Sequence, residues 1–217
     1  SFVGGGASNI NAGNASSIVG GWFNCIGNAS AQSFIGGGYS NCVITNGRGT
    51  ISGGYRNVTS GTTSTISGGY CNTAGGECSF IGGGRKNCAL NGFTTVSGGY
   101  CNVSKGTSSS ITGGYANTAS GNYSFVGGGY LNTVTGTTST IGGGQNNCAY
   151  GACSFIGGGS GNTVSATFSG ILAGSGNTIS STGTTSFIVG SNITADRTCT
   201  TFVNNLSIKN ILSLIHI

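Results

Sequence analysis

The chain has 217 residues, of which 46 are glycine, with no proline, no methionine and only 4% charged residues. Its formal net charge is +5, but the basic residues Arg48, Arg56, Arg85, Lys86 and Lys105 are scattered over many repeats, whereas nucleic-acid binding requires clustered Lys and Arg. No run of about 20 apolar residues could cross a membrane, so we expect neither a nucleic-acid nor a membrane partner for this segment.

From its first residues the chain repeats the motif S-x-I-x-G-G-x-x-N-x-A/V-x-G. From Asn57 onward each step between motif asparagines is 15 residues, and the earlier steps are 15, 17 and 16. A short period sustained along a whole chain indicates a solenoid in which each repeat forms one coil. The motif asparagines are Asn9, Asn24, Asn41, Asn57, Asn72, Asn87, Asn102, Asn117, Asn132, Asn147, Asn162, Asn177 and Asn192.

Each repeat holds two short extended segments, S-x-I-x-G and N-x-A/V-x-G. Residues two apart in a strand face the same side, so we expect Ser, Ile and Gly of the first segment and Asn and Ala/Val of the second to face inward. The apolar position lies six residues before each Asn and is filled by Val or Ile until the last repeat, where Ser186 falls on it. Stacking about 4.8 Å apart would give a rod of roughly 58 Å.

The sequence therefore predicts an all-β fold, a parallel β-solenoid of about 13 coils. An inward column of like asparagines predicts a side-chain amide ladder that holds the coils in register. The predicted ladder consists of Asn57, Asn72, Asn87, Asn102, Asn117, Asn132, Asn147, Asn162 and Asn177.

Seven residues before each Asn, an outward column carries five phenylalanines. A contiguous apolar stripe usually marks an interface, and a thin glycine-rich coil buries little apolar surface to offset the cost of its ordering, about 1.5 kcal/mol per residue. We expect a homo-oligomer, with a trimer favoured, whose interface contains Phe2, Phe34, Phe80, Phe125 and Phe155.

A second outward column, two residues before each Asn, is aromatic. These rings either cover the glycine-rich corners or form a ridge that contacts a glycan or a receptor on a host surface, since amphipathic aromatic side chains suit both roles. The column contains Trp22, Tyr39, Tyr55, Tyr70, Tyr100, Tyr115 and Tyr130.

Nine cysteines are present without a C-x-x-C zinc motif. We interpret them chiefly as small apolar residues, with a disulfide between Cys25 and Cys42 on neighbouring coils as the alternative. Seven N-x-S/T sequons are either chance products of composition or glycosylation sites. They begin at Asn14, Asn28, Asn57, Asn102, Asn122, Asn192 and Asn205.

Catalytic groups are scarce. The only acids, Glu77 and Asp196, are nearly eight coils apart, and His216 is the sole histidine, so neither a carboxylate pair nor a Ser-His-Asp set can form within one chain. The glycine runs lack the Gly-Lys-Ser/Thr of a phosphate-binding loop. We expect no enzymatic activity, no cofactor and no metal.

The pattern A/V-x-G-x-x-S-x-I-x-G, as in Ala119 to Gly128 (ASGNYSFVGG), resembles the head repeats of trimeric autotransporter adhesins of the YadA type. This resemblance implies a left-handed parallel β-roll that trimerises and binds host surfaces. Similar repeats occur in tail fibres of phages and large viruses, and Thr200 to Ile208 (TTFVNNLSI) looks like a linker of such fibres. The 15-residue coil, the Asn column and the cysteines depart from the adhesin pattern.

A second resemblance connects Asn132–Gly136 (NTVTG) and Asn162–Ser165 (NTVS) to the half-coils of grass ice-binding proteins. Ice binding requires a flat, regular array of Thr or similar side chains, and phenylalanines interrupt the outward column of the first segment.

We therefore expect a repeat domain over residues 1–194, a linker or the start of a truncated C-terminal region over 195–211, and a non-native tail over 212–217. The expected function is a structural or attachment fibre at a virion surface or outside the cell, first a viral or phage tail fibre. The alternatives are a bacterial trimeric autotransporter adhesin and an ice-binding solenoid.

Overall fold

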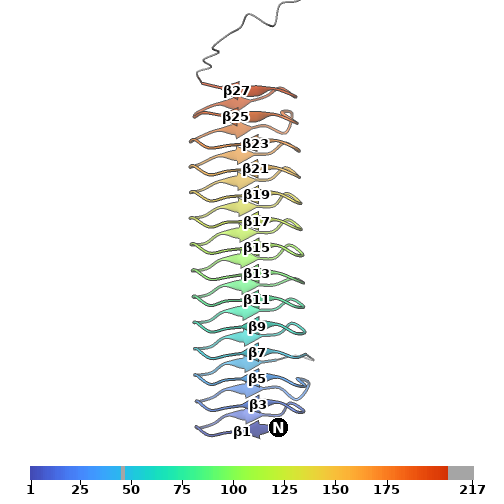
Figure 1. Ribbon diagram of the computed structural model, residues 1–217, viewed down its shortest axis with the longest axis vertical. Helices are drawn as coiled ribbons and strands as arrows, with labels where there is room; N and C mark the ends of the chain where they lie inside the picture. Colours follow the sequence, from blue (N-terminus) through green and yellow to red (C-terminus); the bar gives the residue numbers. More distant parts are fainter. Residues whose placement is uncertain (45–46, 205–217) are drawn as a thin grey trace, which may run out of the picture.

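A computed structural model describes residues 1–44 and 47–204. Within these ranges the chain is all-β and contains no helix. Successive strands alternate between two parallel sheets of 14 and 13 strands, so each turn contributes one strand to each sheet and the coils stack into a straight rod (Figure 1). The predicted parallel β-solenoid of about 13 coils is confirmed. No segment of the described residues forms a helix capable of crossing a membrane.

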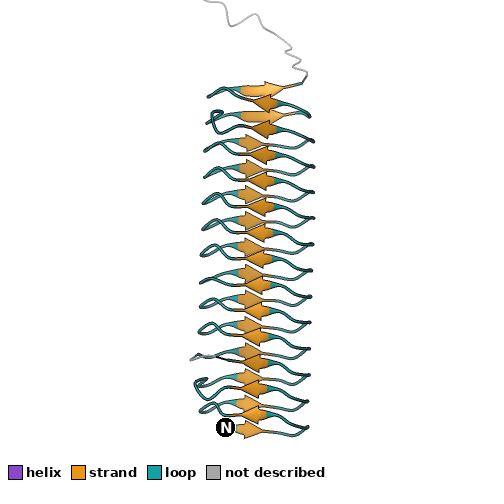
Figure 2. Cartoon of the chain, turned by 180° about the vertical axis from the view of Figure 1, so that it is seen from behind, coloured by secondary structure: helices purple, strands orange, loops and turns teal. Residues whose placement is uncertain are grey.

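The two sheets face each other along the whole rod, as seen from behind in Figure 2. The odd-numbered sheet contains β1 (Phe2–Val3), β3 (Ser17–Ile18), β5 (Phe34–Ile35), β7 (Thr50–Ile51), β9 (Thr65–Ile66), β11 (Phe80–Ile81), β13 (Thr95–Val96), β15 (Ser110–Ile111), β17 (Phe125–Val126), β19 (Thr140–Ile141), β21 (Phe155–Ile156), β23 (Gly170–Ile171), β25 (Phe187–Val189) and β27 (Thr201–Val203). The even-numbered sheet contains β2 (Ile10–Asn11), β4 (Cys25–Ile26), β6 (Cys42–Val43), β8 (Val58–Thr59), β10 (Thr73–Ala74), β12 (Cys88–Ala89), β14 (Val103–Ser104), β16 (Thr118–Ala119), β18 (Thr133–Val134), β20 (Cys148–Ala149), β22 (Thr163–Val164), β24 (Thr178–Ile179) and β26 (Thr194–Ala195).

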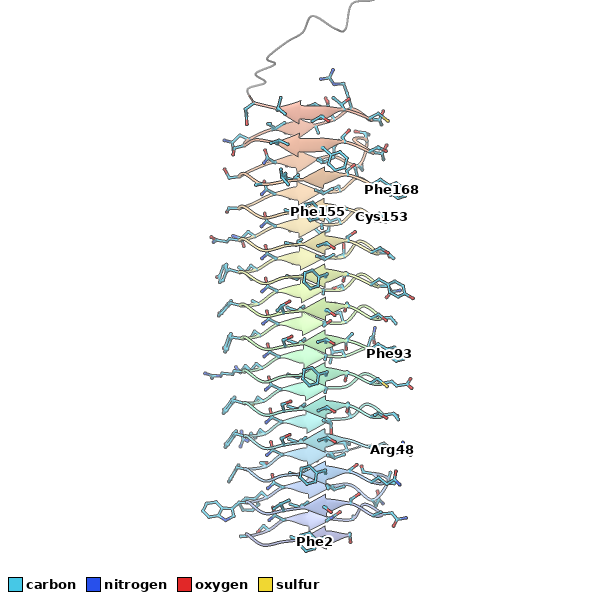
Figure 3. All side chains as sticks on the ribbon, viewed as in Figure 1. Phe2, Arg48, Phe93, Cys153, Phe155 and Phe168 are labelled. Atoms are coloured by element: carbon cyan, nitrogen blue, oxygen red, sulfur yellow. The ribbon has the colours of Figure 1, made fainter. Side chains whose placement is uncertain are left out.

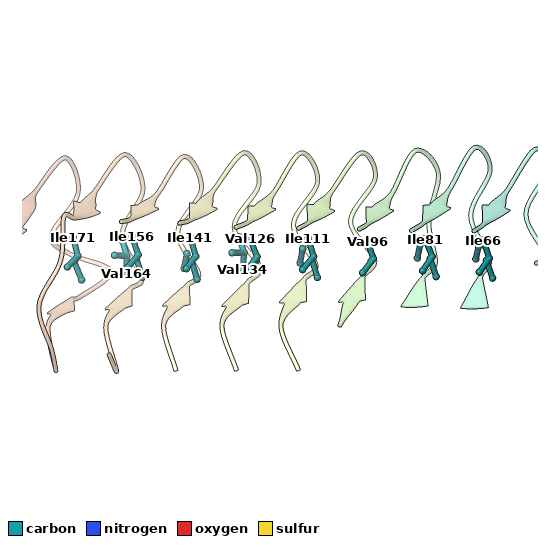
Figure 4. Packing of buried hydrophobic residues seen from close by; sticks show 14 of the residues in the cluster. Ile66, Ile81, Val96, Ile111, Val126, Val134, Ile141, Ile156, Val164 and Ile171 are labelled. Atoms are coloured by element: carbon teal, nitrogen blue, oxygen red, sulfur yellow. The ribbon is translucent and has the colours of Figure 1, made fainter. Parts of the chain in front are cut away.

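The core consists of apolar side chains that both sheets direct into the space between them (Figure 4). The odd-numbered sheet supplies the β-branched column, such as Ile66 and Ile81, and the even-numbered sheet supplies smaller residues such as Ala74 and Val134, all fully buried. Serine two residues before the β-branched position is buried as well, as at Ser64. Ladder hydrogen bonds join each coil to the next because like residues lie in register along the rod.

The inward asparagines stabilise the corner between the two sheets. Asn72 Nδ2 donates to the carbonyl of Gly68 in its own coil and to that of Gly84 in the next, both at 3.0 Å, and Asn72 Oδ1 accepts from the backbone N–H of Asn87 at 2.9 Å. The ladder thus runs mainly from side chain to backbone, which satisfies buried groups that no strand pairs. Direct amide-to-amide contacts of 3.2 Å occur at some steps only, as from Asn117 to Asn102.

Two corner glycines behave differently. The glycine three residues before Asn is left-handed, as at Gly69 (φ 93°), where an added Cβ would lie 2.2 Å from the carbonyl oxygen of Gly84. The glycine four residues before Asn was expected to face inward, and that expectation is wrong. A Cβ added at Gly68 would meet open space, because the chain already leaves the sheet there.

Each regular coil also holds two left-handed positions that are mostly not glycine, one directly before Asn and one six residues after it. Arg56 (φ 52°) and Thr63 (φ 58°) are examples. The left-handed residue reverses the hydrogen-bonding direction, since Tyr55 N donates to the next coil and Arg56 N donates back to Tyr39 O, both at 2.9 Å. This reversal explains why the chain accepts a conformation that L-residues disfavour by about 1–2 kcal/mol.

The last coils correct the sequence-based alignment. Ile188, not Ser186, pairs with Ile171 in the core column, and Ser186 lies in the buried serine column. Ile193, not Asn192, occupies the final ladder position, where its N–H donates to Asn177 Oδ1 at 3.1 Å. The coil here is longer than 15 residues, so a fixed count from the asparagine misplaces it.

The stack continues into the segment expected to be a linker, because β27 pairs in parallel with β25. The rest of that segment from residue 205, including Asn205, and the expected non-native tail 212–217 with His216 lie outside the described residues.

Candidate functional site

The outward side chains two residues before each Asn form one edge of the rod, which we call the aromatic edge. Its residues join neighbouring coils through single parallel bridges such as Tyr55↔Tyr70. In chain order, the bridged residues of the edge are Ala7, Trp22, Tyr39, Tyr55, Tyr70, Arg85, Tyr100, Tyr115, Tyr130, Gln145, Ser160 and Ser175.

The tyrosine rings of the aromatic edge stack on one another. The ring centroids of Tyr39 and Tyr55 are 5.1 Å apart and those of Tyr55 and Tyr70 are 5.0 Å apart, with interplanar angles of 7° and 1°. Tyr115 stacks in the same way between its two neighbours, at 5.1 Å from each. Stacking at the coil spacing uses the ring faces, so ring edges and hydroxyl groups are what the edge presents to a ligand.

The ends of the stack differ from its middle. Trp22 is 58% exposed, and the ring that contacts Tyr39 at this end is Phe23, edge-on at 5.5 Å. At the other end Tyr130 is followed by Gln145. An uncovered aromatic face for carbohydrate stacking is therefore available at the ends rather than along the ridge.

The structure gathers three of the basic residues that look scattered in the sequence. Arg85 lies within the aromatic edge, with Cζ 5.0 Å from the Tyr70 ring centroid and 5.5 Å from that of Tyr100. Arg56 lies 5.2 Å from the Tyr55 ring, and Lys86 follows Arg85 directly. This group was missed in the sequence because only the distance between the basic residues along the chain was considered. Equivalent positions of successive coils lie next to each other in the rod.

The phenylalanine column lies on the outer face of the odd-numbered sheet, where Figure 3 labels Phe2 and Phe155. The phenylalanines are not contiguous, since Phe80 pairs with Thr65 and Thr95. The alignment of the last coils adds Phe187 to this column.

The five phenylalanine rings of the predicted interface each lie next to the glycine two residues later in the same coil, whereas Phe187 is followed by Val189. A Cβ added at Gly82 would lie 3.5 Å from a ring carbon of Phe80, and one at Gly127 would lie 3.5 Å from a ring carbon of Phe125. Some coils without Phe carry a small polar pair at these positions, such as Thr65 and Ser67, and another carries Thr140 and Gly142. The rings therefore cover gaps on a flat face, with Phe34, Phe80, Phe125 and Phe155 still 38–42% exposed.

The edge opposite the aromatic one carries the left-handed residues six positions after Asn, which sequence reasoning did not single out. Figure 3 shows Phe93, Cys153 and Phe168 projecting from it. Phe93, Tyr123 and Phe168 are 57–64% exposed. A shallow hollow on this edge is lined by Ala31, Gln32, Gly47, Arg48, Thr62 and Thr63.

Four of the nine cysteines, Cys25, Cys42, Cys88 and Cys148, lie on the outer face of the even-numbered sheet. Cys25 and Cys42 are direct partners on neighbouring strands, and burial, followed by the neighbouring Cys25 thiol, raises the pKa of Cys42 to about 11. Burial, followed by Cys101, raises the pKa of Cys88. A hydrogen bond to Cys148 raises the pKa of Tyr150. All nine cysteines are free thiols.

The sequons divide into two groups. Asn57 and Asn102 are fully buried in the ladder, so their amide nitrogens cannot accept a glycan in the folded rod. Asn14, Asn28, Asn122 and Asn192 are exposed.

The described residues contain no group of three or more His, Cys, Asp or Glu side chains that could hold a metal ion. The ion pair found in this part of the chain joins Asp196 to Arg197 at 3.7 Å, with both side chains exposed. Glu77 lies near the edge opposite the aromatic one, where its carbonyl accepts a hydrogen bond from Phe93 N.

The chain matches no protein-family model and no curated protein sequence.

Proposed function

We propose that this chain is a rod segment of a structural fibre that mediates attachment to a surface, located at a virion surface or outside the cell and acting by binding rather than by catalysis. The observation that carries the proposal is the separation of inward and outward residues along two continuous sheets of 14 and 13 strands. The inward serine, Ile/Val and asparagine columns repeat with few changes, whereas outward positions vary from coil to coil. Such a rod can act as an extended spacer. Its outward side chains can vary and serve in binding, because the fold does not depend on them.

The finer assignment rests on the resemblance of the repeats to YadA-type heads and viral tail-fibre repeats. The preferred assignment is a viral or phage tail fibre, and the alternative is a bacterial trimeric autotransporter adhesin. Neighbouring genes in the full-length locus distinguish the two, since capsid or baseplate genes support the first and an outer-membrane anchor supports the second.

Association of three chains through the odd-numbered sheet is part of the proposal. Its outer face carries Phe80, Phe125 and Phe155 flat over glycines, and the outward residues of its strands include no charged side chain. A flat, uncharged face with partly exposed rings suits contact with sister chains. The expected result of sedimentation analysis of the whole chain is a trimer.

A matched variant tests the interface. Phe80→Thr converts one coil to the Thr-x-Gly pattern found at Thr140 and Gly142, and should leave the coil folded while weakening association. Gly82 is kept, because a Cβ added there would lie 2.4 Å from the carbonyl oxygen of Ser97. A well-folded monomer of the wild-type chain would contradict the proposed interface.

Attachment itself is tested with beads that carry the whole chain, compared with beads that carry the heat-denatured chain, on a panel of bacterial and eukaryotic cells. We expect retention of the native beads on at least one cell type. Equal retention of native and denatured beads on every cell type would refute attachment.

One observation favours ice binding as a second candidate. The outer face of the even-numbered sheet contains a column without phenylalanine, in which Thr118, Thr133, Thr163 and Thr178 are partly exposed. Thr side chains at the coil spacing provide a regular array, although Cys148 and the exposed Tyr150 interrupt it. Thermal hysteresis and ice shaping by the purified rod would favour this candidate over attachment.

A further inference from the structure

Arg85 lies in the aromatic edge, and two further cations, Arg56 and Lys86, occupy the position that follows this edge, all within three consecutive coils. Arg56 follows Tyr55, and the bridges Tyr55↔Tyr70 and Tyr70↔Arg85 place Arg85 and Lys86 two coils further along. Two steps of about 4.8 Å separate these levels by about 10 Å. We call Arg56, Arg85 and Lys86 the cation cluster.

Ring contacts hold both arginines of the cation cluster in place. The Arg85 guanidinium lies between the rings of Tyr70 and Tyr100, at 5.0 and 5.5 Å, and that of Arg56 lies 5.2 Å from the Tyr55 ring. Arg85 stacks between two aromatic faces, which keeps its N–H groups at the edge of the guanidinium plane, free to bind an anion with little loss of freedom. Arg56 lies beside Tyr55, whose two faces are covered by Tyr39 and Tyr70.

The charge of the cluster is not neutralised within the described residues. No hydrogen bond or ion pair to the side chains of Arg56, Arg85 or Lys86 is found there. The acidic residues of the described ranges are Asp196, which pairs with Arg197, and Glu77, which lies near the edge opposite the aromatic one. A cluster of like charges without counterions on the protein attracts anions from solution.

We propose that the cation cluster, with the tyrosine hydroxyl groups beside it, binds a linear acidic polysaccharide through its carboxylate or sulfate groups. This inference rests on the proposed attachment function and names the chemical class of the ligand. Arginine N–H groups pair with carboxylate and sulfate oxygens in a bidentate manner, and the hydroxyls of Tyr70 and Tyr100 suit the hydroxyl groups of sugars. A polymer that runs along the rod meets both kinds of group.

The geometry disfavours two other ligands. Single-stranded nucleic acid is bound by stacking bases on open aromatic faces, and along this edge the faces of rings such as Tyr55 and Tyr115 are covered by their neighbours. A neutral glycan would lack partners for three cations. The aromatic edge is thus better suited to charge and hydroxyl recognition than to the ring stacking that an aromatic column first suggests.

The test measures binding of the whole chain to immobilised heparin as a sulfated polymer and to polygalacturonate as a carboxylated one, with dextran and single-stranded poly(dT) as comparisons. The cluster variant combines Arg56→Asn, Arg85→Tyr and Lys86→Asn. Tyrosine at position 85 continues the ring stack, and asparagine tolerates the left-handed backbone of positions 56 and 86. The control variant removes three cations elsewhere, with Arg48→Gln, Lys105→Gln and Arg197→Gln, so both variants have the same net charge.

We expect wild type to bind at least one of the two acidic polymers, and the cluster variant to lose about tenfold affinity or more while the control variant stays close to wild type. Lys86→Asn alone, which leaves the ring stack untouched, should give a smaller loss in the same direction. Which polymer binds more tightly identifies sulfate or carboxylate as the preferred group.

Equal losses in the cluster and control variants would overturn the inference, because they would report net charge alone. Tighter binding of poly(dT) than of either acidic polysaccharide would also overturn it, in favour of nucleic acid. If neither polysaccharide binds wild type while native beads still attach to cells, the cation cluster is not the binding site and the proposed attachment function stands.

Discussion

The ladder asparagines should contribute strongly to the stability of the rod, and Asn117 is a typical member. Its Nδ2 donates to the carbonyls of Gly113 at 3.0 Å and Gly129 at 2.9 Å, and its Oδ1 accepts from Asn132 N at 2.9 Å. Asn117→Asp keeps the shape of the side chain but removes both donors and turns an oxygen toward two carbonyls. With two or more buried groups left unsatisfied at about 1–3 kcal/mol each, we expect a loss of about 3–5 kcal/mol at pH 7.

The sign of the pH dependence follows from the same contacts. Burial and the facing carbonyls disfavour a carboxylate at position 117, so its pKa in the folded variant lies above the unfolded value of about 3.9. A raised pKa means that stability is retained below about pH 4 and is lost as the pH rises through the folded-state pKa. Lowering the pH from 7 to about 4 should therefore restore part of the lost stability.

The measurement is the midpoint and slope of urea denaturation followed by far-ultraviolet circular dichroism. Thr118→Ala is the matched control, because Thr118 is adjacent but faces outward and should change stability by no more than about 0.5 kcal/mol. If Asn117→Asp denatures at the same urea concentration as Thr118→Ala at pH 7, the ladder does not stabilise the corner as argued.

Three shorter predictions concern the corners and the thiols. Gly99→Ala should prevent local folding, because Gly99 has φ 88° and an added Cβ would lie 2.2 Å from the carbonyl oxygen of the next coil. Gly98→Ala should leave the coil folded, because the space around Gly98 is open. The midpoint of thermal unfolding compares the two variants. Thr138→Asn should raise the free energy of unfolding by about 0.5–1 kcal/mol, since Thr138 is β-branched with φ 56° and asparagine tolerates that backbone better, and an unchanged urea midpoint would contradict this. Cys42, with a pKa of about 11, should react with iodoacetamide at pH 8 much more slowly than the exposed Cys78, because the thiolate is the nucleophile; mass spectrometry of partially alkylated protein checks this.

The sequence was sufficient to predict the fold because the inward positions obey one rule in almost every coil. A β-branched residue lies six positions before an asparagine, and this pair recurs at a fixed period. The pattern allows the coils to stack in one register only. The glycine four residues before Asn, as at Gly68, does not face inward as expected, and the column assignment failed where the period changed, at Ser186 and Asn192. There the triplet Ser-Phe-Ile, which also precedes Gly82 and Gly157, marks the core position better than the distance to the asparagine.

The outward chemistry could be predicted only in part. The aromatic column was found from spacing, but its stacking follows from the coil separation and the ring orientation, which no single repeat reveals. The left-handed positions went unnoticed because Arg56, Thr63 and Phe93 are not residues that signal such a backbone. Hydrogen-bond reversal between coils imposes the conformation, and this cause is visible only once the coils are stacked.

Position in a column, rather than position in the sequence, therefore determines what a surface side chain can do in this rod. A tyrosine between two tyrosines loses both ring faces to its neighbours and keeps its hydroxyl group. An arginine in the same column, as at Arg85, ends one ring stack and begins another while holding its charge at a fixed point. Because the inward residues alone maintain the register, a single substitution in the column moves or removes such a charge without altering the coils beneath it. A rod of this kind can change its ligand by changing the order of residues along one edge, as at Arg85, which interrupts the tyrosines and carries the charge on which the cation cluster is centred.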